Sequence, residues 1–248
     1  MRKGLKIRKN NLESINIFGN IFDFTEIYID LKFPLDKLKK YFGKNITIHA
    51  AHYEDGFDPS NKDSFELNKN ILELAAKAAD IVDSPWIIVH PGHNLSSNSQ
   101  KNMFEFFDKY WDSRIIFENC PAIDNAENGL KYLFSLPNDL KNLLHRYRAG
   151  TILDFGHAIC TANTLNLKVD QLINEFYELK PVTFHISGIE LNADTDSHLH
   201  LFEVENNMEY LRKIPNNKLV TFEVPNEGVK DKNKLLKDIE VFNAVVKS

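Results

Sequence analysis

The 248-residue sequence predicts an α/β fold, a single (β/α)8 TIM barrel that forms one domain over residues 1–248. The length is close to the roughly 250 residues of one such barrel. Short apolar runs alternate with amphipathic segments, a pattern typical of parallel strands joined by helices. Eight such units favour a closed barrel over an open doubly wound sheet. No Gly-x-Gly-x-x-Gly motif follows the first run, so a nucleotide-binding sheet has no support.

Eight runs have the character of buried parallel strands, because each is short, apolar and bounded by turn-forming or polar residues. Since a helical segment separates each from the next, the sheet is predicted to be parallel throughout. The runs are 5–8, 26–30, 46–50, 86–90, 114–119, 151–155, 182–186 and 219–224.

Amphipathic segments fill the gaps between these runs. Residues 64–82 repeat apolar side chains at nearly 3.6-residue spacing, and Ser64 is their expected N-cap. Pro137 is expected to break the segment 128–147 into two helices. The other expected helices are 34–42, 100–111, 168–179 and 232–246, with a first helix inside 11–22.

Composition and charge exclude several classes of protein. The net charge is −5 and the 30 Lys and Arg residues are scattered, which argues against nucleic-acid binding by bulk charge alone. Cys120 and Cys160 are too few for a disulfide framework or a Cys-rich zinc site. No apolar run reaches the roughly 18 residues of a membrane span, and the basic N-terminus lacks the apolar stretch of a signal peptide. The sequence therefore predicts a cytoplasmic protein with no membrane partner.

Six consecutive predicted strands, the third to the eighth, end their apolar runs with His, Asp or Glu. The C-terminal rim of a barrel is where residues from several strand ends build an active site. Six such groups in one ring are costly unless ions compensate them, and a divalent metal suits both carboxylates and imidazoles. One such residue alone could simply cap a strand, as His145 is expected to be a plain surface residue, but six in register indicate a metal centre. The six are His49, His90, Glu118, Asp154, His185 and Glu223.

A second group of polar residues follows the seventh predicted strand. Asp196 and His198 are two residues apart and can point to the same side of an extended loop. With His157 they can close a further metal site of the His/Asp/His type. The alternative is a polar surface loop. Four more residues near the rim are candidates for contact with substrate: His52, Tyr53, His93 and His200.

The ordered motifs resemble those of the endonuclease IV group (AP endonuclease family 2) of the xylose-isomerase-like barrels, over about residues 46–225. The motifs are His90-Pro-Gly, Glu118-Asn, Asp154-x-x-His157 and Asp196-x-His198. In that group nine residues hold three zinc ions, and each has a counterpart here. The resemblance implies one metal on His49, His90 and Glu118, a second on Glu118, Asp154, His185 and Glu223, and a third on His157, Asp196 and His198.

The chain departs from that group where the group contacts DNA. The N-terminal Gly-rich helix is missing, and the segment YIDLKFPLDKL after the second strand lacks the Asn-Pro-Arg-like end. His52 and then Tyr53 occur in the loop after His49, so the aromatic residue that enters DNA in that group is offset or missing. Ile-Ser-Gly follows His185 in place of an Asn-Asp pair. These departures weaken the expectation of DNA recognition and leave the metal ligands intact.

Two enzyme functions follow from these motifs. The favoured one is a metal-dependent phosphoester hydrolase with two or three zinc ions, or manganese, that acts on abasic-site DNA in DNA repair or on a smaller phosphodiester. Two metal ions about 3.5–4 Å apart lower the pKa of a shared water, and Glu118 would bridge them. The alternative is a sugar or sugar-phosphate isomerase or epimerase that uses a single metal, with Glu118 and Glu223 moving protons.

Glu118 and Glu223 are therefore the expected catalytic residues. A single metal would leave four candidate ligands without a role, which favours hydrolysis; these are His49, His90, Asp196 and His198. A non-catalytic binding barrel is disfavoured, because every ligand is present.

Overall fold

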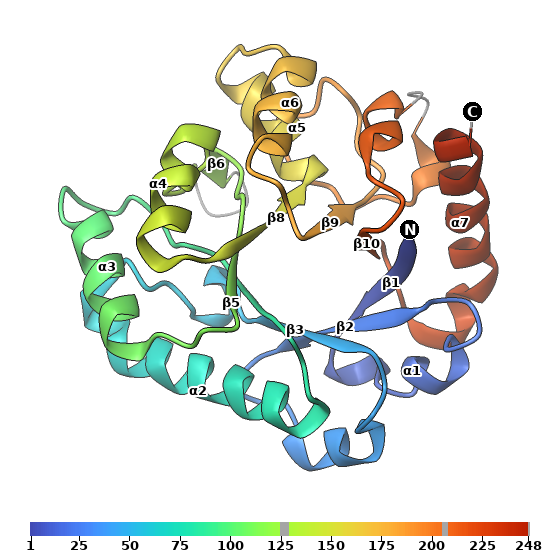
Figure 1. The fold of residues 1–248 in the computed structure, drawn as a ribbon, viewed down its shortest axis with the longest axis horizontal. Helices are drawn as coiled ribbons and strands as arrows, with labels where there is room; N and C mark the ends of the chain where they lie inside the picture. Colours follow the sequence, from blue (N-terminus) through green and yellow to red (C-terminus); the bar gives the residue numbers. More distant parts are fainter. Residues whose placement is uncertain (125–128, 205–207, 248) are drawn as a thin grey trace.

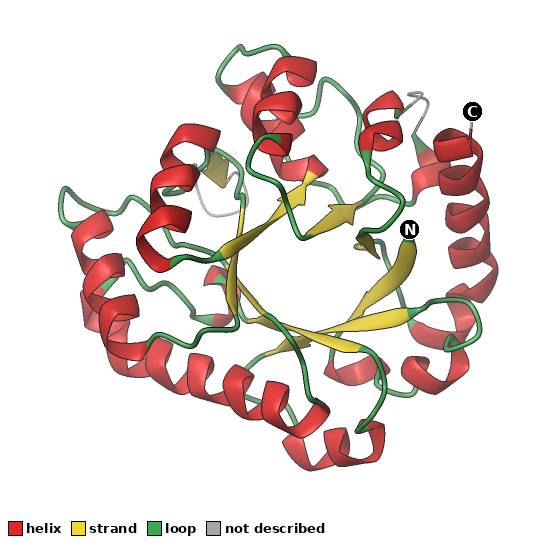
Figure 2. Cartoon of the chain, in the orientation of Figure 1, coloured by secondary structure: helices red, strands yellow, loops and turns green. Residues whose placement is uncertain are grey.

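Eight parallel strands close into a barrel in the computed structural model, which describes residues 1–124, 129–204 and 208–247. The order around the barrel is β1-β10-β9-β8-β5-β4-β3-β2, and helices surround it (Figures 1 and 2). The predicted (β/α)8 barrel is confirmed, and each predicted run overlaps one barrel strand. The strands are β1 (Arg2–Ile7), β2 (Phe24–Ile29), β3 (Ile46–Ala50), β4 (Ile87–Val89), β5 (Ile115–Glu118), β8 (Gly150–Asp154), β9 (Thr183–Ile186) and β10 (Leu219–Phe222).

The outer layer combines α-helices with short 3₁₀ segments. The longest helix, α2, buries Ile71 and Ala75, and its alanines let it lie close against β3. The α-helices are α1 (Ser14–Ile17), α2 (Phe65–Val82), α3 (Ser99–Tyr110), α4 (Pro137–Tyr147), α5 (Phe155–Thr164), α6 (Val169–Tyr177) and α7 (Lys232–Lys247). The 3₁₀ segments are η1 (Lys9–Asn11), η2 (Leu35–Tyr41), η3 (Tyr53–Asp55), η4 (Lys62–Ser64), η5 (Leu201–Glu203), η6 (Glu209–Lys213) and η7 (Gly228–Asp231).

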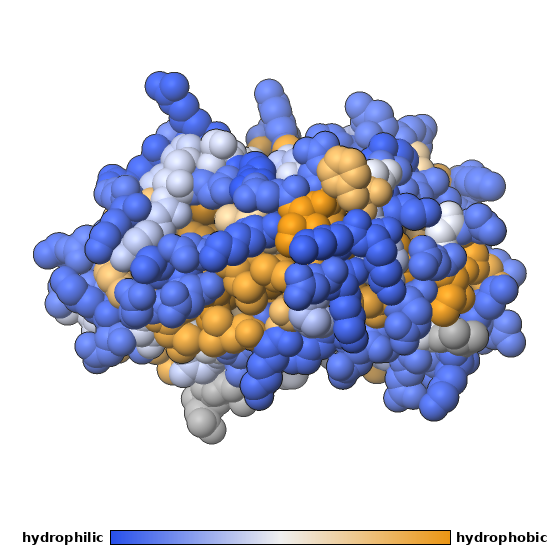
Figure 3. Space-filling view, turned by 90° about the horizontal axis from the view of Figure 1, so that it is seen from below, coloured by the Kyte–Doolittle hydropathy of each residue, from blue (hydrophilic) through white to orange (hydrophobic). Residues whose placement is uncertain are grey.

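The outer surface is mainly polar. Figure 3 shows the side on which α2 lies, where hydrophilic residues surround smaller apolar patches. No helix among the described residues combines the length and the hydropathy that crossing a bilayer requires.

The expected helix pair across residues 128–147 is wrong. Only Pro137–Tyr147 is helical, and Pro137 begins this helix. The reason is that proline fits the first turn, where a backbone N–H has no helical partner in any case. Before it, β6 (Ile123–Asp124) pairs antiparallel with β7 (Leu130–Lys131). Residues 125–128 lie outside the described part of the chain.

Two other helical segments differ from the sequence expectation. The sequence reading contained no helix at α5, which starts directly after β8, where the Asp154 side chain caps it by accepting the His157 backbone N–H at 2.8 Å. The segment expected to be a helix at 34–42 takes the tighter 3₁₀ form over Leu35–Tyr41.

The barrel interior is apolar at its lower end. Ile88, Ile116 and Ile152 form a buried cluster of their own. Side chains alternate along a strand, so the residues two positions further on point to the same side. Those residues are the ligand-type side chains of β5 and β8, Glu118 and Asp154, and His90, which directly follows β4. The apolar cluster therefore forms the floor beneath a polar site.

Candidate metal centre

Each barrel strand, or the residue directly after it, places an ionisable side chain in the interior above this floor. Six of these residues are the predicted strand-end ligands, and β1 and β2 add Lys6 and Glu26. Glu26, His49 and His185 are fully buried, and the interior of a barrel offers such groups no bulk water. The ring must therefore satisfy its own charges or bind ions.

Glu118 lies between two groups of ligand atoms. Its Oε2 is 2.9 Å from His49 Nε2 and 3.2 Å from His90 Nε2. Its Oε1 is 3.4 Å from His185 Nδ1. One carboxylate thus directs one oxygen toward each group, which is the arrangement of a bridging ligand.

The second group consists of Glu118, Asp154, His185 and Glu223. His185 Nδ1 is 3.0 Å from Glu223 Oε2 and 3.8 Å from Asp154 Oδ2. The candidate ligand atoms within each of these two groups all lie within 4.8 Å of one another.

Three buried atoms of the second group have no partner apart from one another: Glu118 Oε1 and Glu223 Oε2 lie 3.4 and 3.0 Å from His185 Nδ1. Buried polar atoms are normally paired, so three such atoms facing one point require an explanation. Imidazole nitrogens and carboxylate oxygens are the ligands of zinc and of manganese. The residues therefore fit a divalent metal, without specifying which one.

The third predicted set is only partly assembled. Asp196 Oδ2 lies 3.3 Å from His157 Nε2 and 3.1 Å from His198 Nε2. Among the described residues, this set does not reach the mutual 4.8 Å spacing of the other two groups. His198 is also the most exposed of its members, with a side chain 39% accessible.

Two glycines allow the loop that carries Asp196 and His198 to approach the barrel. A Cβ on Gly156 would lie 2.9 Å from Asp196 Oδ1. A Cβ on Gly188 would overlap the carbonyl of His200, because Gly188 exchanges both backbone hydrogen bonds with Leu199, at 2.7 and 3.0 Å. Gly188, in the Ser-Gly pair after β9, therefore permits the close approach of the loop backbone.

The other ring nitrogen of three histidines is held in place, which fixes how each ring is oriented. His49 Nδ1 donates to the Ala50 carbonyl at 2.6 Å, and His157 Nδ1 donates to the Asn119 carbonyl at 2.7 Å. His185 Nε2 donates to Glu26 Oε2 at 2.8 Å. Each ring is left with one nitrogen directed at the cluster.

Lys6 and Glu26 are the site residues that sequence reasoning missed. Lys6 Nζ donates to Glu223 Oε1 at 2.7 Å and is 3.8 Å from Glu26 Oε1. Glu26 Oε2 also accepts from Thr221 Oγ1 at 3.1 Å. The period-two alternation of β1 and β2 was the available signal, since it places a charged side chain inside the barrel in each strand.

Burial and neighbouring charges set the pKa values of the cluster. Burial raises the pKa of Asp154 to about 6 and lowers the pKa of His90 to about 4. Burial also opposes protonation of His185, but the Glu26 and Glu118 carboxylates outweigh it and raise the His185 pKa well above its usual value. For Glu118, His185 and His90 outweigh the cost of burial, so its pKa is held well below the usual range.

Metal affinity at the second group is expected to rise with pH. The raised pKa of His185 means that the metal-free ring keeps a proton at neutral pH, and a metal must displace it. One displaced proton makes the association constant increase about tenfold per pH unit. Below pH 6 Asp154 adds a second proton, because its pKa is about 6, and the slope steepens. Competition with a chelator over a pH series measures this, and a pH-independent affinity would contradict it.

Replacement of Glu26 by glutamine is expected to weaken zinc binding roughly 10- to 100-fold, as loss of a residue that orients a ligand does. The variant keeps the side-chain volume but removes the charge that holds His185 Nε2–H. Isothermal titration with zinc measures the effect. Glu66→Gln, at a side chain 75% exposed on α2, is the matched control and should bind zinc like the parent. Equal affinity in Glu26→Gln would show that Glu26 does not support the site.

The four candidate substrate residues lie in different places. His52 lines the pocket at the cluster, and its ring stacks on His90 with centroids 5.0 Å apart. Tyr53 contacts His93 edge to face at 4.5 Å, and His93 Nδ1 lies 3.3 Å from Asp58 Oδ2. His200 is buried, and its Nδ1 is 2.7 Å from Asp238 Oδ2 on α7. Of the four, only His52 is brought to the cluster.

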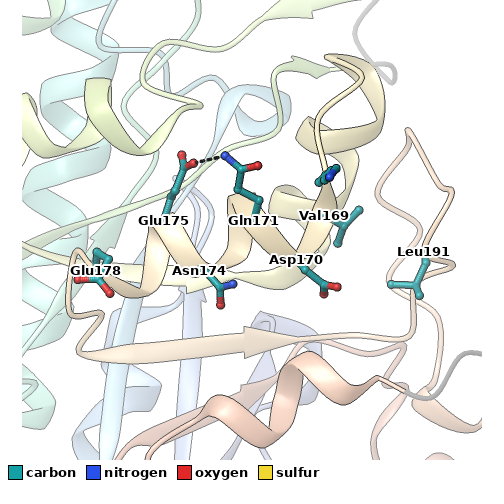
Figure 4. A pocket seen from close by; sticks show the side chains of 8 residues that line it. Val169, Asp170, Gln171, Asn174, Glu175, Glu178 and Leu191 are labelled. Carbon is teal, nitrogen blue, oxygen red and sulfur yellow. Dashed lines mark hydrogen bonds between the residues drawn. The ribbon is translucent and has the colours of Figure 1, made fainter.

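The cluster opens into a pocket of about 150 Å³. His90, Glu118, His157, Asp196 and Glu223 line it. A larger hollow of about 720 Å³ lies elsewhere, along the outer face of α6 (Figure 4). The described residues that line that hollow include no histidine and no member of the cluster. Because candidate metal ligands line the smaller pocket and not the larger hollow, the smaller pocket is the candidate functional site.

Comparisons with known proteins identify the fold and no more. No protein-family model matches the chain, and no curated protein matches it. A D-tagatose 3-epimerase-like protein matches at 19% identity and a TM-score of 0.69, covering 100% of this chain and 98% of that one.

Endonuclease IV from Thermus thermophilus matches at 15% identity and a TM-score of 0.69, covering 100% and 99%. A further Thermus thermophilus protein, soaked with ZnCl2, matches at 15% and 0.68, covering 100% and 98%. The chain thus shares its fold with proteins whose names point to different reactions.

Proposed function

We propose that this chain is a metal-dependent phosphoester hydrolase. The observation that carries the proposal is the position of Glu118, whose two oxygens face two separate groups of ligand atoms. Hydrolases of phosphoesters use two metal ions side by side, whereas a reaction that needs one metal has no use for the second group. The structural likeness to endonuclease IV agrees with this assignment.

In this proposal His49 and His90 hold one ion with Glu118, and Asp154, His185 and Glu223 hold a second with it. Ions bound there would polarise a phosphoryl oxygen. They would also lower the pKa of a bound water, so that hydroxide becomes available near neutral pH. Glu118 keeps the two positions at a fixed separation. Lys6, by donating to Glu223 Oε1, leaves Oε2 of that carboxylate facing the ligands.

Residues of the third set contribute from the pocket wall. His198 Nε2 is 3.2 Å from Glu223 Oε1 and burial is incomplete, so the ring borders the space that a substrate would enter. In the metal-free protein the Glu223 and Asp196 carboxylates outweigh burial and raise its pKa to about 9. An N–H of the ring can donate to an oxygen of the substrate. The pocket volume favours a small phosphodiester as the substrate.

The proposal is tested by metal counting together with cleavage assays. We expect at least two zinc or manganese ions per chain and metal-dependent hydrolysis of bis(p-nitrophenyl) phosphate. An abasic-site duplex is assayed in parallel, to separate DNA from a smaller phosphodiester. The proposal would be contradicted if the metal-loaded protein hydrolysed neither compound at any pH at which it remains folded.

A sugar or sugar-phosphate isomerase or epimerase is the second candidate. It is favoured by one arrangement: Glu118 Oε1 and Glu223 Oε2 lie 3.4 and 3.0 Å from the same nitrogen, His185 Nδ1. Two carboxylates around one metal position can transfer protons on either side of a sugar. An epimerase-like protein also shares the fold. A single bound metal and interconversion of ketose epimers would support this function over hydrolysis.

A further inference from the structure

A second hollow adjoins the cluster pocket, next to the end of β1. Its volume is about 370 Å³, and we call it the β1 pocket, after Lys6, Arg8, Asn11 and Asn226 in its lining. Lys6, His198 and Glu223 line both this hollow and the cluster pocket. The two hollows therefore adjoin, and these three side chains lie at their boundary.

The end of β1 places two cations in this pocket. Lys6 and Arg8 are two residues apart, and Arg8 continues the extended backbone with φ −109° and ψ 169°. Alternation along an extended chain directs both side chains to one side. The Lys6 ammonium is deep, with 8% of the side chain exposed, whereas 56% of the Arg8 side chain is exposed at the mouth.

Arg8 is held in position by its neighbours. Its guanidinium lies over the Tyr28 ring, 4.3 Å from the centroid, and 3.7 Å from Asp55 Oδ2. Tyr28 donates its hydroxyl hydrogen to the same Asp55 oxygen at 2.6 Å. A cation that stacks on an aromatic ring keeps its edge N–H groups available for a planar or tetrahedral anion.

Asn226 supplies a further donor. Its Oδ1 accepts the Gly228 backbone N–H at 2.9 Å, and its carbonyl accepts from Asn11 Nδ2 at 2.5 Å. The amide is thereby oriented with Nδ2 at its other end. Nδ2 is buried and has no hydrogen-bond partner among the described residues. A buried donor without a partner is costly, and an acceptor on a ligand would satisfy it.

We propose that the β1 pocket binds a phosphate group of the substrate, separate from the phosphoester that is cleaved. This inference rests on the proposed function, since it takes the reacting phosphoester to lie at the metal ligands. The carboxylates in the pocket lining are Glu223 and the exposed Glu54. Outside the lining, Asp55 lies 3.7 Å from Arg8 and Glu26 lies 3.8 Å from Lys6. The guanidinium, the ammonium and the amide belong to residues that line this one hollow, and each is a type of donor that an oxyanion accepts from. The substrate class is a small phosphodiester that carries a second phosphate.

The test is a calorimetric titration of the zinc-loaded protein with inorganic phosphate, which measures the phosphate affinity. We expect Arg8→Met to weaken phosphate binding about tenfold or more, since a hydrogen bond to a charged group contributes that much. Arg146→Met is the matched control: Arg146 also stacks on an aromatic ring, at 4.5 Å from the Phe104 centroid, and pairs with an aspartate, but it lies on α4. The control should bind phosphate like the parent.

Unchanged phosphate affinity in Arg8→Met would overturn the inference, because phosphate would then bind at the zinc ions alone. A loss of affinity for an abasic duplex with no loss for phosphate would also overturn it, since Arg8 would then serve a nucleic acid. These results are independent of the cleavage assays. Arg8-dependent phosphate binding without any hydrolysis would leave the pocket assigned and remove only the proposed function.

Discussion

Replacement of Glu118 by glutamine is expected to lower kcat/KM for phosphodiester hydrolysis about 10³-fold or more. Both groups of ligand atoms depend on this carboxylate, through Oε2 and Oε1. Metal-ion catalysis contributes several kcal/mol to the transition state, and about 1.4 kcal/mol corresponds to a factor of ten in rate. Steady-state kinetics with bis(p-nitrophenyl) phosphate measure the loss, and elemental analysis measures the metal that remains.

A control variant tests whether replacing an ionisable residue outside the cluster also lowers activity. His145→Gln changes an exposed histidine on α4 and should keep full activity and full metal content. Circular dichroism of Glu118→Gln should match that of the parent, because glutamine fits the same volume. If Glu118→Gln kept its metals and its activity, Glu118 would not be a bridging ligand.

Removal of metal is expected to lower the melting temperature by roughly 8–16 °C. Zinc at about a thousand times its Kd stabilises the folded state by about 4 kcal/mol. For a chain of this size each kcal/mol shifts Tm by roughly 2–4 °C. The physical cause is the crowding of Glu26, Glu118, Asp154 and Glu223 around one interior, with Lys6 as their nearest lysine.

Thermal melts with saturating zinc and with a chelator measure this shift. The Glu118→Gln variant provides the control, because its melting temperature should respond much less to zinc. Equal melting temperatures with zinc and with chelator in the parent protein would mean that the cluster is stable without ions.

The strand-end ligands could be predicted from the sequence because their signal is local. An apolar run that ends in a polar residue reveals both the strand and the direction of its end, as at His49 and Glu118. Barrel closure then brings these ends together by symmetry alone. The order of the eight strands followed from their alternation with helices, from their number and from the length of the chain.

Lys6 and Glu26 are harder to find, because strand alternation is their only local signal and their partners are far along the chain. Lys6 meets Glu223 only when β1 pairs with β10, and Glu26 meets His185 across 159 positions. A charged residue inside a strand reads as solvent-exposed until those partners are known. The pairing of β1 with β10, which closes the barrel, brings the Lys6 ammonium to the Glu223 carboxylate and so compensates both charges.

The same limit applies to histidines near the rim. Proximity in sequence suggested that His93 and His200 contact substrate. The structure instead places His93 beside Asp58 and His200 beside Asp238, which lies 38 residues later on α7. Each of these histidines has an acidic neighbour that is distant in sequence, so the sequence alone could not place it.

The central claim is that two metal ions bind on either side of Glu118. Anomalous X-ray scattering at the zinc edge, from crystals soaked with zinc, tests it most directly. The account predicts one peak about 2.0–2.2 Å from the ligand atoms of His49, His90 and Glu118. It predicts a second peak at the same distances from Glu118, Asp154, His185 and Glu223. Crystals with no peak beside Glu118, or with a peak on one side only, would contradict it.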